Sequence, residues 1–266
     1  MIAQLHQKTP IDVIHSQSMG ANGVLKWAKS NSIPIVSTWH GTNLTELSAH
    51  FSSASYNPRY WHWLVITPIT MLTRYLTMEL PIRKASSAIT LVSPTLEKHM
   101  RKHANGKVIT IPNGVFIPKN PGTNFDSKVL ELISIGRLVK QKGVQHAIHG
   151  LYDLPENLRS KVHLNIVGEG PYLTDLKHLC ANLEMDSCVT FHGRMVGDEL
   201  ANMYEKCQIH LMPTTSHEGL PLTILEGMSY GLVTIASNIG GIPSLITHRE
   251  DGLLISPGNR EDLTDN

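Results

Sequence analysis

Cysteine is scarce in this sequence: Cys180, Cys188 and Cys207 are the three present among 266 residues. An odd number argues against a disulfide framework, and their spacing does not match a paired metal-ligand motif. A reducing, cytoplasmic location is the expectation that follows. The first residues agree with it, because Gln4 and His6 interrupt the apolar run that a secretory signal peptide requires.

The sequence also lacks an excess of one charge and a long apolar run. Its 23 basic and 22 acidic side chains give a formal net charge of +1, so no nucleic-acid partner is expected. The longest apolar stretch runs from Trp61 to Leu72 and is interrupted by Pro68 and several polar residues. It is too short and too polar to cross a hydrocarbon layer of about 30 Å. A membrane-spanning helix is therefore not expected.

Short apolar segments alternate with amphipathic stretches along almost the whole chain. Stretches such as 171–183 and 197–206 have the length and periodicity of helices. This alternation predicts parallel sheets that are covered by helices on both faces. We predict strands over residues 11–15, 33–38, 88–92, 107–111, 130–135, 162–167, 188–191, 208–212, 232–236 and 252–255.

The clearest break in composition is the segment from Pro112 to Ser127, which is rich in proline, glycine and asparagine. Segments of this kind are typical of linkers between domains. We therefore predict a first α/β domain over residues 1–118, a linker over 119–127 and a second α/β domain over 128–266.

Two glutamates eight positions apart, Glu218 and Glu226, stand out in the second half of the chain. The apolar run before them predicts a buried strand, and Pro221 suits the first position of a helix that ends near Gly231. The apolar face of this helix is predicted to carry Leu222, Leu225 and Met228. Loops at the carboxyl ends of parallel strands are where open sheets bind ligands. A carboxylate on each side of a helix start suits a ligand with hydroxyls at two ends and phosphate between, such as a nucleotide sugar.

Three more predicted strands end in turns that suit a phosphate ligand. Arg137 follows Gly136 at one strand end and Lys142 precedes a helix, which is a fitting pair of cations for a diphosphate. Two solvated surface cations are the alternative reading of that pair. A glycine-rich turn follows at 168–171, and the next strand ends in the segment 191–195. Each signal is weak alone, but four such loops at one sheet edge favour a shared ligand site.

These residues together resemble the retaining, nucleotide-sugar-dependent glycosyltransferases of family 4. The resemblance rests on Gly136-Arg137 with Lys142-Gly143, on the turns at 168–171 and 191–193, and above all on the spaced glutamate pair. It is strong from Val129 to about Ile255 and looser before residue 115. It implies the GT-B architecture, in which two Rossmann-like, doubly wound parallel-sheet domains face an interdomain cleft.

The resemblance also implies roles for individual residues. Arg137 and Lys142 would hold the donor diphosphate without a metal ion or other cofactor. Glu226 would bind the ribose hydroxyls, and Glu218 would face the transferred sugar. The remaining site residues would contact sugar, phosphate or base, and they are Gly219, Leu220, Pro221 and Met195.

In the predicted first domain, the segment 36–42 looks like the family's strand that carries an active-site histidine, His40. A histidine there can hydrogen-bond the transferred sugar near neutral pH, although a purely structural strand-end histidine is the alternative. His99 and His103 have the spacing of metal ligands, but the segment lacks the intervening glutamate of a zinc protease. We interpret it as a solvated helix end and expect no metal site.

The sequence departs from the family pattern at both ends. No glycine-rich loop precedes the predicted strand 11–15, and the family's closing helices are missing after 252–255. The first domain is therefore expected to be incomplete. The chain is expected to be an internal piece of a longer enzyme, or a gene product shortened at both ends.

The expected function is transfer of a sugar, with retention, from a UDP- or GDP-linked donor to a glycan or lipid-linked acceptor. Cell-envelope or exopolysaccharide synthesis is the expected setting. A catalytically impaired nucleotide-sugar-binding fragment remains an alternative. A glycoside hydrolase would use Glu218 and Glu226 as acid and nucleophile, but that reading gives Arg137 and Lys142 no role.

An apolar, aromatic stretch from Tyr60 to Leu76 has Arg74, Arg83 and Lys84 nearby. Aromatics with flanking cations suit peripheral contact with the inner face of a membrane, in which Trp61 and Trp63 would take part. A long helix packed into the core of the first domain is the other interpretation.

Overall fold

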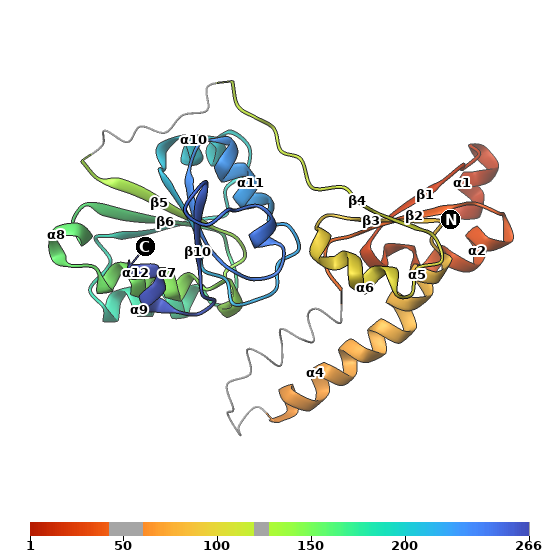
Figure 1. The fold of residues 1–266 in the computed structure, drawn as a ribbon, viewed down its shortest axis with the longest axis horizontal. Coiled ribbons are helices and arrows are strands. Elements are labelled where there is room, and N and C mark those ends of the chain that lie inside the picture. The colour runs from red at the N-terminus through yellow and green to blue at the C-terminus, as the bar shows by residue number, and fades with distance from the viewer. Residues whose placement is uncertain (43–60, 120–127, 266) are drawn as a thin grey trace. The chain divides into compact units, whose positions relative to one another are not determined.

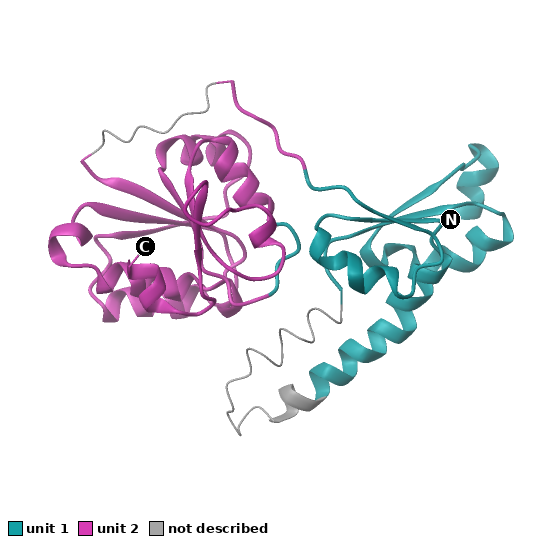
Figure 2. Ribbon diagram, in the orientation of Figure 1, with its two compact units in different colours: residues 1–113, 217–220 teal, residues 114–216, 221–266 magenta. Residues whose placement is uncertain are grey.

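A computed structural model describes residues 1–42, 61–119 and 128–265. The chain divides into two compact units (Figure 2). The first unit contains residues 1–113 and 217–220, and the second contains 114–216 and 221–266. Most of the linker predicted over 119–127 lies outside the described residues.

The first unit is built on a four-stranded sheet in the order β1-β2-β3-β4, with every neighbouring pair parallel (Figure 1). Its strands are β1 (Ile14–Gln17), β2 (Ile35–Trp39), β3 (Ala88–Leu91) and β4 (Lys107–Thr110). Its helices are α1 (Ile2–Lys8), η1 (Ser18–Val24), α2 (Leu25–Ser30), α4 (Trp61–Arg74), η3 (Tyr75–Glu79), α5 (Leu80–Ala85), η4 (Pro94–Leu96) and α6 (Glu97–Arg101). The predicted strand at 11–15 starts later, because pairing with β2 begins at Ile14.

A buried ion pair joins two helical segments of the first unit. Arg83 of α5 and Glu79 of η3 both have fully buried side chains and contact each other. The Arg83 guanidinium lies 5.7 Å from the Trp39 ring centroid and 5.5 Å from that of Tyr75, within cation–π range. Arg83 is therefore a core residue, and the sequence interpretation that grouped it with membrane-facing cations is wrong.

The second unit is built on a six-stranded sheet in the order β10-β9-β8-β5-β6-β7, again with parallel pairs throughout. Its strands are β5 (Leu130–Ile135), β6 (Val162–Val167), β7 (Val189–Gly193), β8 (Ile209–Met212), β9 (Val233–Ser237) and β10 (Gly252–Ile255). Its helical segments are η5 (Lys140–Lys142), α7 (Val144–Asp153), α8 (Glu156–Arg159), α9 (Leu173–Asn182), α10 (Asp198–Lys206), α11 (Leu222–Ser229), η6 (Ile242–Ser244) and α12 (Arg260–Asp265).

This strand order is that of a Rossmann-like, doubly wound sheet. Counted along the chain from β5, the order is 3-2-1-4-5-6 read from one edge. The direction of winding reverses between β5 and β8, and the carboxyl-end crevice at such a reversal is where these sheets bind ligands. The predicted fold class, two parallel α/β domains, is confirmed.

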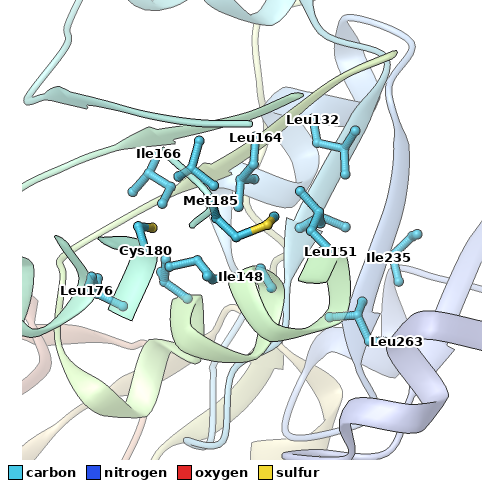
Figure 3. Close-up of a cluster of buried hydrophobic side chains, with 14 of the residues drawn as sticks. Leu132, Ile148, Leu151, Leu164, Ile166, Leu176, Cys180, Met185, Ile235 and Leu263 are labelled. Carbon is cyan, nitrogen blue, oxygen red and sulfur yellow. The ribbon is translucent and has the colours of Figure 1, made fainter. Parts of the chain in front are cut away.

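A large cluster of buried apolar side chains in the second unit lies on the face of the sheet covered by α7, α9 and α12 (Figure 3). Leu164 and Ile166 of β6 pack there with Ile148 of α7 and Leu176 of α9, and all four are fully buried. Burying such a side chain contributes about 1.5–3 kcal/mol relative to leaving it exposed. This layer holds the strand ends in place for the loops that follow them.

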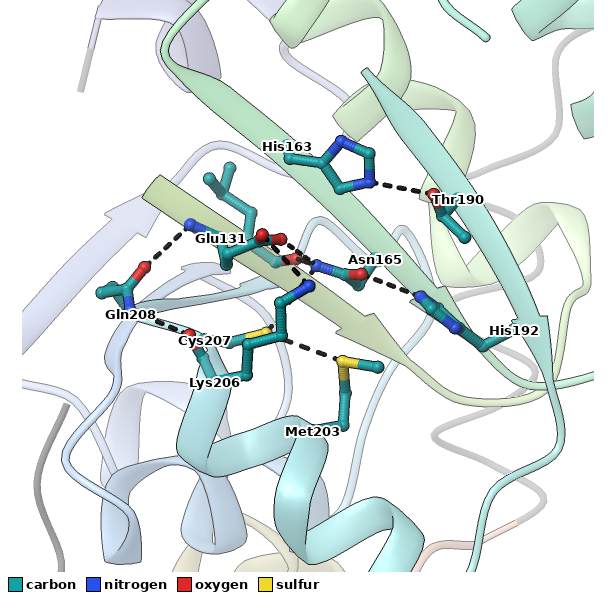
Figure 4. Close-up of polar contacts among 10 residues, drawn as sticks. Glu131, His163, Asn165, Thr190, His192, Met203, Lys206, Cys207 and Gln208 are labelled. Atoms are coloured by element: carbon teal, nitrogen blue, oxygen red, sulfur yellow. Dashed lines mark hydrogen bonds and ion pairs between the residues drawn. The ribbon is translucent and has the colours of Figure 1, made fainter. Parts of the chain in front are cut away.

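A polar network links three strands and α10 (Figure 4). Asn165 of β6, 1% exposed, donates from Nδ2 to Glu131 of β5 (2.8 Å) and accepts at Oδ1 from Nε2 of His192 in β7 (2.8 Å). Lys206 at the end of α10 forms an ion pair with Glu131 (3.1 Å). Burial lowers the pKa of His192, so the neutral ring is favoured in this network. The network fixes β5, β6 and β7 relative to one another.

The helix after the glutamate loop differs from its predicted form in two ways. It begins at Leu222, so Pro221 is its N-cap and not its first residue. Its fully buried side is formed by Ile224 and Gly227, whereas Leu222 is 49% exposed. Gly227 faces β8, and a Cβ atom there would lie 3.4 Å from the Cβ atom of His210, which is an ordinary van der Waals contact.

Candidate functional site

The loop after β5 carries the two predicted phosphate ligands. Gly136 follows β5 with φ +152°, a conformation that favours glycine. Arg137 follows and is exposed, and Lys142, in η5, is half-buried. In the part of the chain that the structure describes, Arg137 makes no ion pair. Its guanidinium is therefore available to a ligand at this edge of the sheet.

The loops after β5 and β8 are fixed to each other across the reversal point of the sheet. The carbonyl oxygen of Gln141 accepts from the backbone N–H of Thr215 (2.8 Å) and the hydroxyl of Thr214 (3.0 Å). Gly143, with φ +76°, lies so close to Pro213 that a Cβ atom would be 1.8 Å from its carbonyl oxygen. Only glycine fits at this position. Lys142 is thus anchored beside the start of the loop that leads to the two glutamates.

The loops after β6 and β7 join the same edge. Leu138 donates its backbone N–H to Glu169 (2.8 Å), and Gly168 donates to the carbonyl of Gly193 (2.6 Å). Met195, two residues further on, is half-buried against the cluster that contains Tyr204. The structure therefore brings the loops after β5, β6, β7 and β8 together, as the sequence pattern indicated.

Glu226 lies in the middle of α11 and is half-buried. Its Oε2 accepts a hydrogen bond of 2.9 Å from the hydroxyl of Tyr204 in α10. Tyr204 is 2% exposed, and its ring stacks on that of Tyr230 with a centroid distance of 5.2 Å. Burial, with the Glu226 carboxylate beside it, raises the pKa of Tyr204, so its hydroxyl keeps the proton it donates.

The first unit holds the other predicted catalytic residues. His40 follows β2, is exposed, and makes a hydrogen bond of 2.8 Å from Nε2 to Oε1 of Gln17. Within the same unit, Gly219 lies against the carbonyl of His40, and a Cβ atom there would be 1.9 Å from that oxygen. The amide of Asn113 donates to the carbonyl of Leu220 (3.1 Å). His40 and the segment with Glu218 are therefore neighbours.

Two residues that shape this region carry no signal in the sequence. In the sequence, Tyr204 is one aromatic residue in a segment predicted to be an amphipathic helix, and Asn165 is a polar residue inside a predicted strand. Their hydrogen-bond partners lie more than 20 positions away in the sequence. Tyr204 bonds to Glu226, and Asn165 bonds to Glu131 and His192. Such pairings follow from tertiary structure and have no local spacing rule.

Metal-binding clusters and membrane-spanning helices were sought among the described residues. Over the described residues, no group of three or more His, Cys, Asp or Glu side chains could hold a metal ion. Across the ranges 1–42, 61–119 and 128–265, every helix falls short of the length and apolar character needed to cross a bilayer.

Comparison with known families gives two matches that together cover the chain. The model of the family described as "Glycosyl transferases group 1" matches residues 118–266. The model described as "Glycosyltransferase Family 4" matches residues 1–117.

Similar proteins of known or assigned function are found in sequence and in structure. The sulfoquinovosyl transferase SQD2 of Arabidopsis thaliana is 28% identical over 94% of this chain and 48% of its own length. A crystal structure of Anabaena HepE with UDP and glucose matches with a TM-score of 0.75 at 19% identity, over 99% of this chain and 70% of HepE. The sucrose-phosphate synthase of Thermosynechococcus elongatus matches with a TM-score of 0.78 at 20% identity, over 99% of this chain and 65% of the synthase.

The chain is shorter than these proteins. It spans 48% of the Arabidopsis protein and 53% of an uncharacterized glycosyltransferase of Haemophilus influenzae that is 28% identical to it. The structural matches, all below 25% identity, establish the fold.

Proposed function

Because the chain belongs to the group 1 glycosyl transferases, we propose that it takes part in sugar transfer from a nucleotide-diphosphate sugar to a glycan or lipid-linked acceptor. The observation that carries this proposal is the arrangement at the reversal point of the second sheet. There the loop with Arg137 and Lys142 is hydrogen-bonded to the loop that leads into α11 and Glu226. Two cations and a carboxylate on one Rossmann-like edge match the diphosphate and ribose of such a donor.

UDP is the nucleotide that the comparisons favour for a first test. HepE was crystallised with UDP and glucose, and its fold is similar to that of this chain. A GDP-linked donor is the second candidate. In this proposal Arg137 and Lys142 hold the diphosphate, Glu226 holds the ribose, and main-chain groups near Met195 face the base.

The proposed chemistry retains the configuration at the anomeric carbon. The acceptor hydroxyl attacks on the face from which the diphosphate departs, the new C–O bond forms as the bond to phosphate breaks, and a phosphate oxygen takes the acceptor proton. The protein then supplies positioning and charge stabilisation. His40 and Glu218, neighbours in the first unit, would hydrogen-bond the transferred sugar, and the segment 219–221 would contact sugar and phosphate.

The two glutamates are expected to differ in what they bind. Glu226→Gln should weaken the binding of free UDP by about tenfold or more, because a hydrogen bond to a charged group is lost. Glu218→Gln should leave UDP binding nearly intact and lower turnover of the sugar donor. Isothermal titration calorimetry with UDP, followed by a donor turnover assay, measures both effects.

The matched control for this pair is Glu205→Gln. Glu205 is an exposed glutamate on α10 next to Tyr204, so the change removes a charge from the same helix without touching the proposed ligands. It should bind UDP like the wild type. Equal losses of UDP affinity in the Glu218 and Glu226 variants would contradict the proposed division of roles.

We also propose peripheral contact with an anionic membrane through α4 and η3. Ile66, Ile69, Leu72 and Leu76 are each between 47% and 59% exposed there. Arg74 and Lys84 are exposed nearby, whereas the side chains of Trp61 and Trp63 lie outside the described residues. Apolar side chains beside cations suit insertion into a headgroup layer, and lipid-linked acceptors would be found at that surface.

Vesicle co-sedimentation tests the membrane proposal. The wild type should sediment with anionic vesicles at low salt and be released by high salt. The double variant Ile69→Ser, Leu72→Ser should bind about tenfold more weakly, because two apolar side chains no longer enter the lipid. Leu158→Ser, at a 46% exposed leucine of the second unit, is the control. No sedimentation of the wild type at low salt would refute the proposal.

A further inference from the structure

The carboxylate of Glu226 is not a freely rotating side chain. One of its oxygens, Oε2, accepts the hydroxyl of Tyr204 at 2.9 Å. Tyr204 comes from a different helix, 22 positions earlier in the chain, so the bond ties α11 to α10. A half-buried carboxylate held in this way presents its remaining lone pairs in one direction.

Tyr204 is itself held by packing on several sides. Its side chain is 2% exposed and lies in a cluster with Ile133, Met203 and Leu232. Its ring stacks on Tyr230 with planes 13° apart and centroids separated by 5.2 Å. A buried aromatic ring in a stacked pair has few alternative positions. The hydroxyl is therefore presented to Glu226 from a rigid support.

We infer that Tyr204 is a positioning residue for nucleotide recognition: it orients Glu226 toward the ribose hydroxyls and so favours ribonucleotide donors. This inference rests on the function proposed for Glu226. Because Tyr204 is buried, it acts through Glu226 and not by contact with the ligand. Preorganisation of a binding group lowers the entropy that must be lost when the ligand binds.

Tyr204→Phe removes the hydroxyl and keeps the ring, so the stack on Tyr230 and the packing of the cluster are retained. This variant should bind UDP about tenfold more weakly than the wild type, since a hydrogen bond to a charged group is lost and Glu226 becomes free to rotate. It should bind 2′,3′-dideoxy-UDP as the wild type does, because that nucleotide has no hydroxyls for Glu226. Both affinities are measured by calorimetry on the 266-residue chain.

A merely structural role for Tyr204 predicts a different pattern. Loss of packing would weaken the binding of UDP and of dideoxy-UDP by the same factor. The effect of Tyr204→Phe would then persist in a Glu226→Ala background. In our account the effect of Tyr204→Phe disappears in that background, because the group it orients is gone. Tyr230→Phe, which keeps the stacked ring, is the matched control and should bind UDP normally.

The outcomes separate this inference from the function on which it rests. If Glu226→Ala weakens UDP binding and Tyr204→Phe does not, the positioning role is wrong and the nucleotide site stands. If Tyr204→Phe loses affinity for UDP and for dideoxy-UDP by the same factor, the positioning role is also wrong. If the wild type does not bind UDP or GDP, the proposed function fails, and the inference fails with it.

Discussion

Replacing Arg137 or Lys142 by alanine is expected to lower kcat/KM for sugar transfer by about 30- to 1000-fold. In the proposed reaction the departing nucleoside diphosphate gains negative charge as its bond to the sugar breaks, and each cation would stabilise that charge more in the transition state than in the ground state. Removal of one such preorganised charge contact costs about 2–4 kcal/mol. Both residues lie on a loop anchored to its neighbours through Gln141 and Gly143, so their positions are preorganised.

Two further variants sharpen this test. Arg137→Lys keeps the charge but loses the planar fork that would contact two phosphate oxygens in the proposed site, so its activity should lie between those of the wild type and Arg137→Ala. Lys161→Ala removes an exposed cation just before β6, at the opposite edge of the same sheet, and should leave kcat/KM unchanged. Wild-type turnover in either alanine variant would show that the diphosphate is bound elsewhere.

Acid is expected to destabilise the second unit through His210. This histidine of β8 is completely buried, and neither ring nitrogen has a hydrogen-bond partner among the described residues. Burial lowers the pKa of His210 to about 4, from an ordinary value near 6.5. The unfolded chain therefore binds a proton at a higher pH than the folded chain does, so the stability that neutral His210 provides is complete above about pH 6.5 and is lost as pH falls toward 4.

The expected loss between pH 6.5 and 4 is about 2–4 kcal/mol in the free energy of unfolding. Urea unfolding at a series of pH values measures it. His210→Leu, which replaces the ring by a neutral side chain of similar size, should show a smaller slope over this range. His178→Leu, at an exposed position of α9, should keep the wild-type slope. An unchanged slope in His210→Leu would contradict the assignment.

Part of this acid sensitivity should remain in His210→Leu. Burial also lowers the pKa of His146, His149 and His192 in the same unit, so each of these groups favours its neutral form in the folded state. The contribution of His210 is therefore the difference between the wild-type and variant slopes, and not the whole slope.

The strands of the second unit could be predicted closely from the sequence. Residues 130–135, 162–167 and 252–255 form strands with the predicted bounds, because each is an apolar run that stops at a turn residue or an exposed polar segment. The alternation of these runs with helices also predicted the parallel sheet, and hence the edge at which the loops meet.

What could not be predicted depends on contacts between distant residues. The side of α11 that is buried is set by its approach to His210, which places Gly227 against the sheet and leaves Leu222 exposed. The sequence contains 15 histidines, and no local pattern distinguishes His210 as the buried one. Arg83 reads as a surface cation, because nothing in its sequence neighbourhood shows that Trp39 and Tyr75 enclose it.

We expect a nucleoside diphosphate to bind the second unit at the carboxyl edge of its sheet. This binding is measured by titrating the isotope-labelled chain with UDP, and in parallel with GDP, and following the backbone amide signals by NMR. We predict that one of them shifts the amide signals of Arg137, Lys142 and Glu226 and of the residues next to them, and that the shifts are lost in Arg137→Ala. Shifts confined to the hollow at the opposite edge, lined by Tyr152, Arg159 and His163, or no shifts with either nucleotide, would show that the nucleotide site is not at the carboxyl edge.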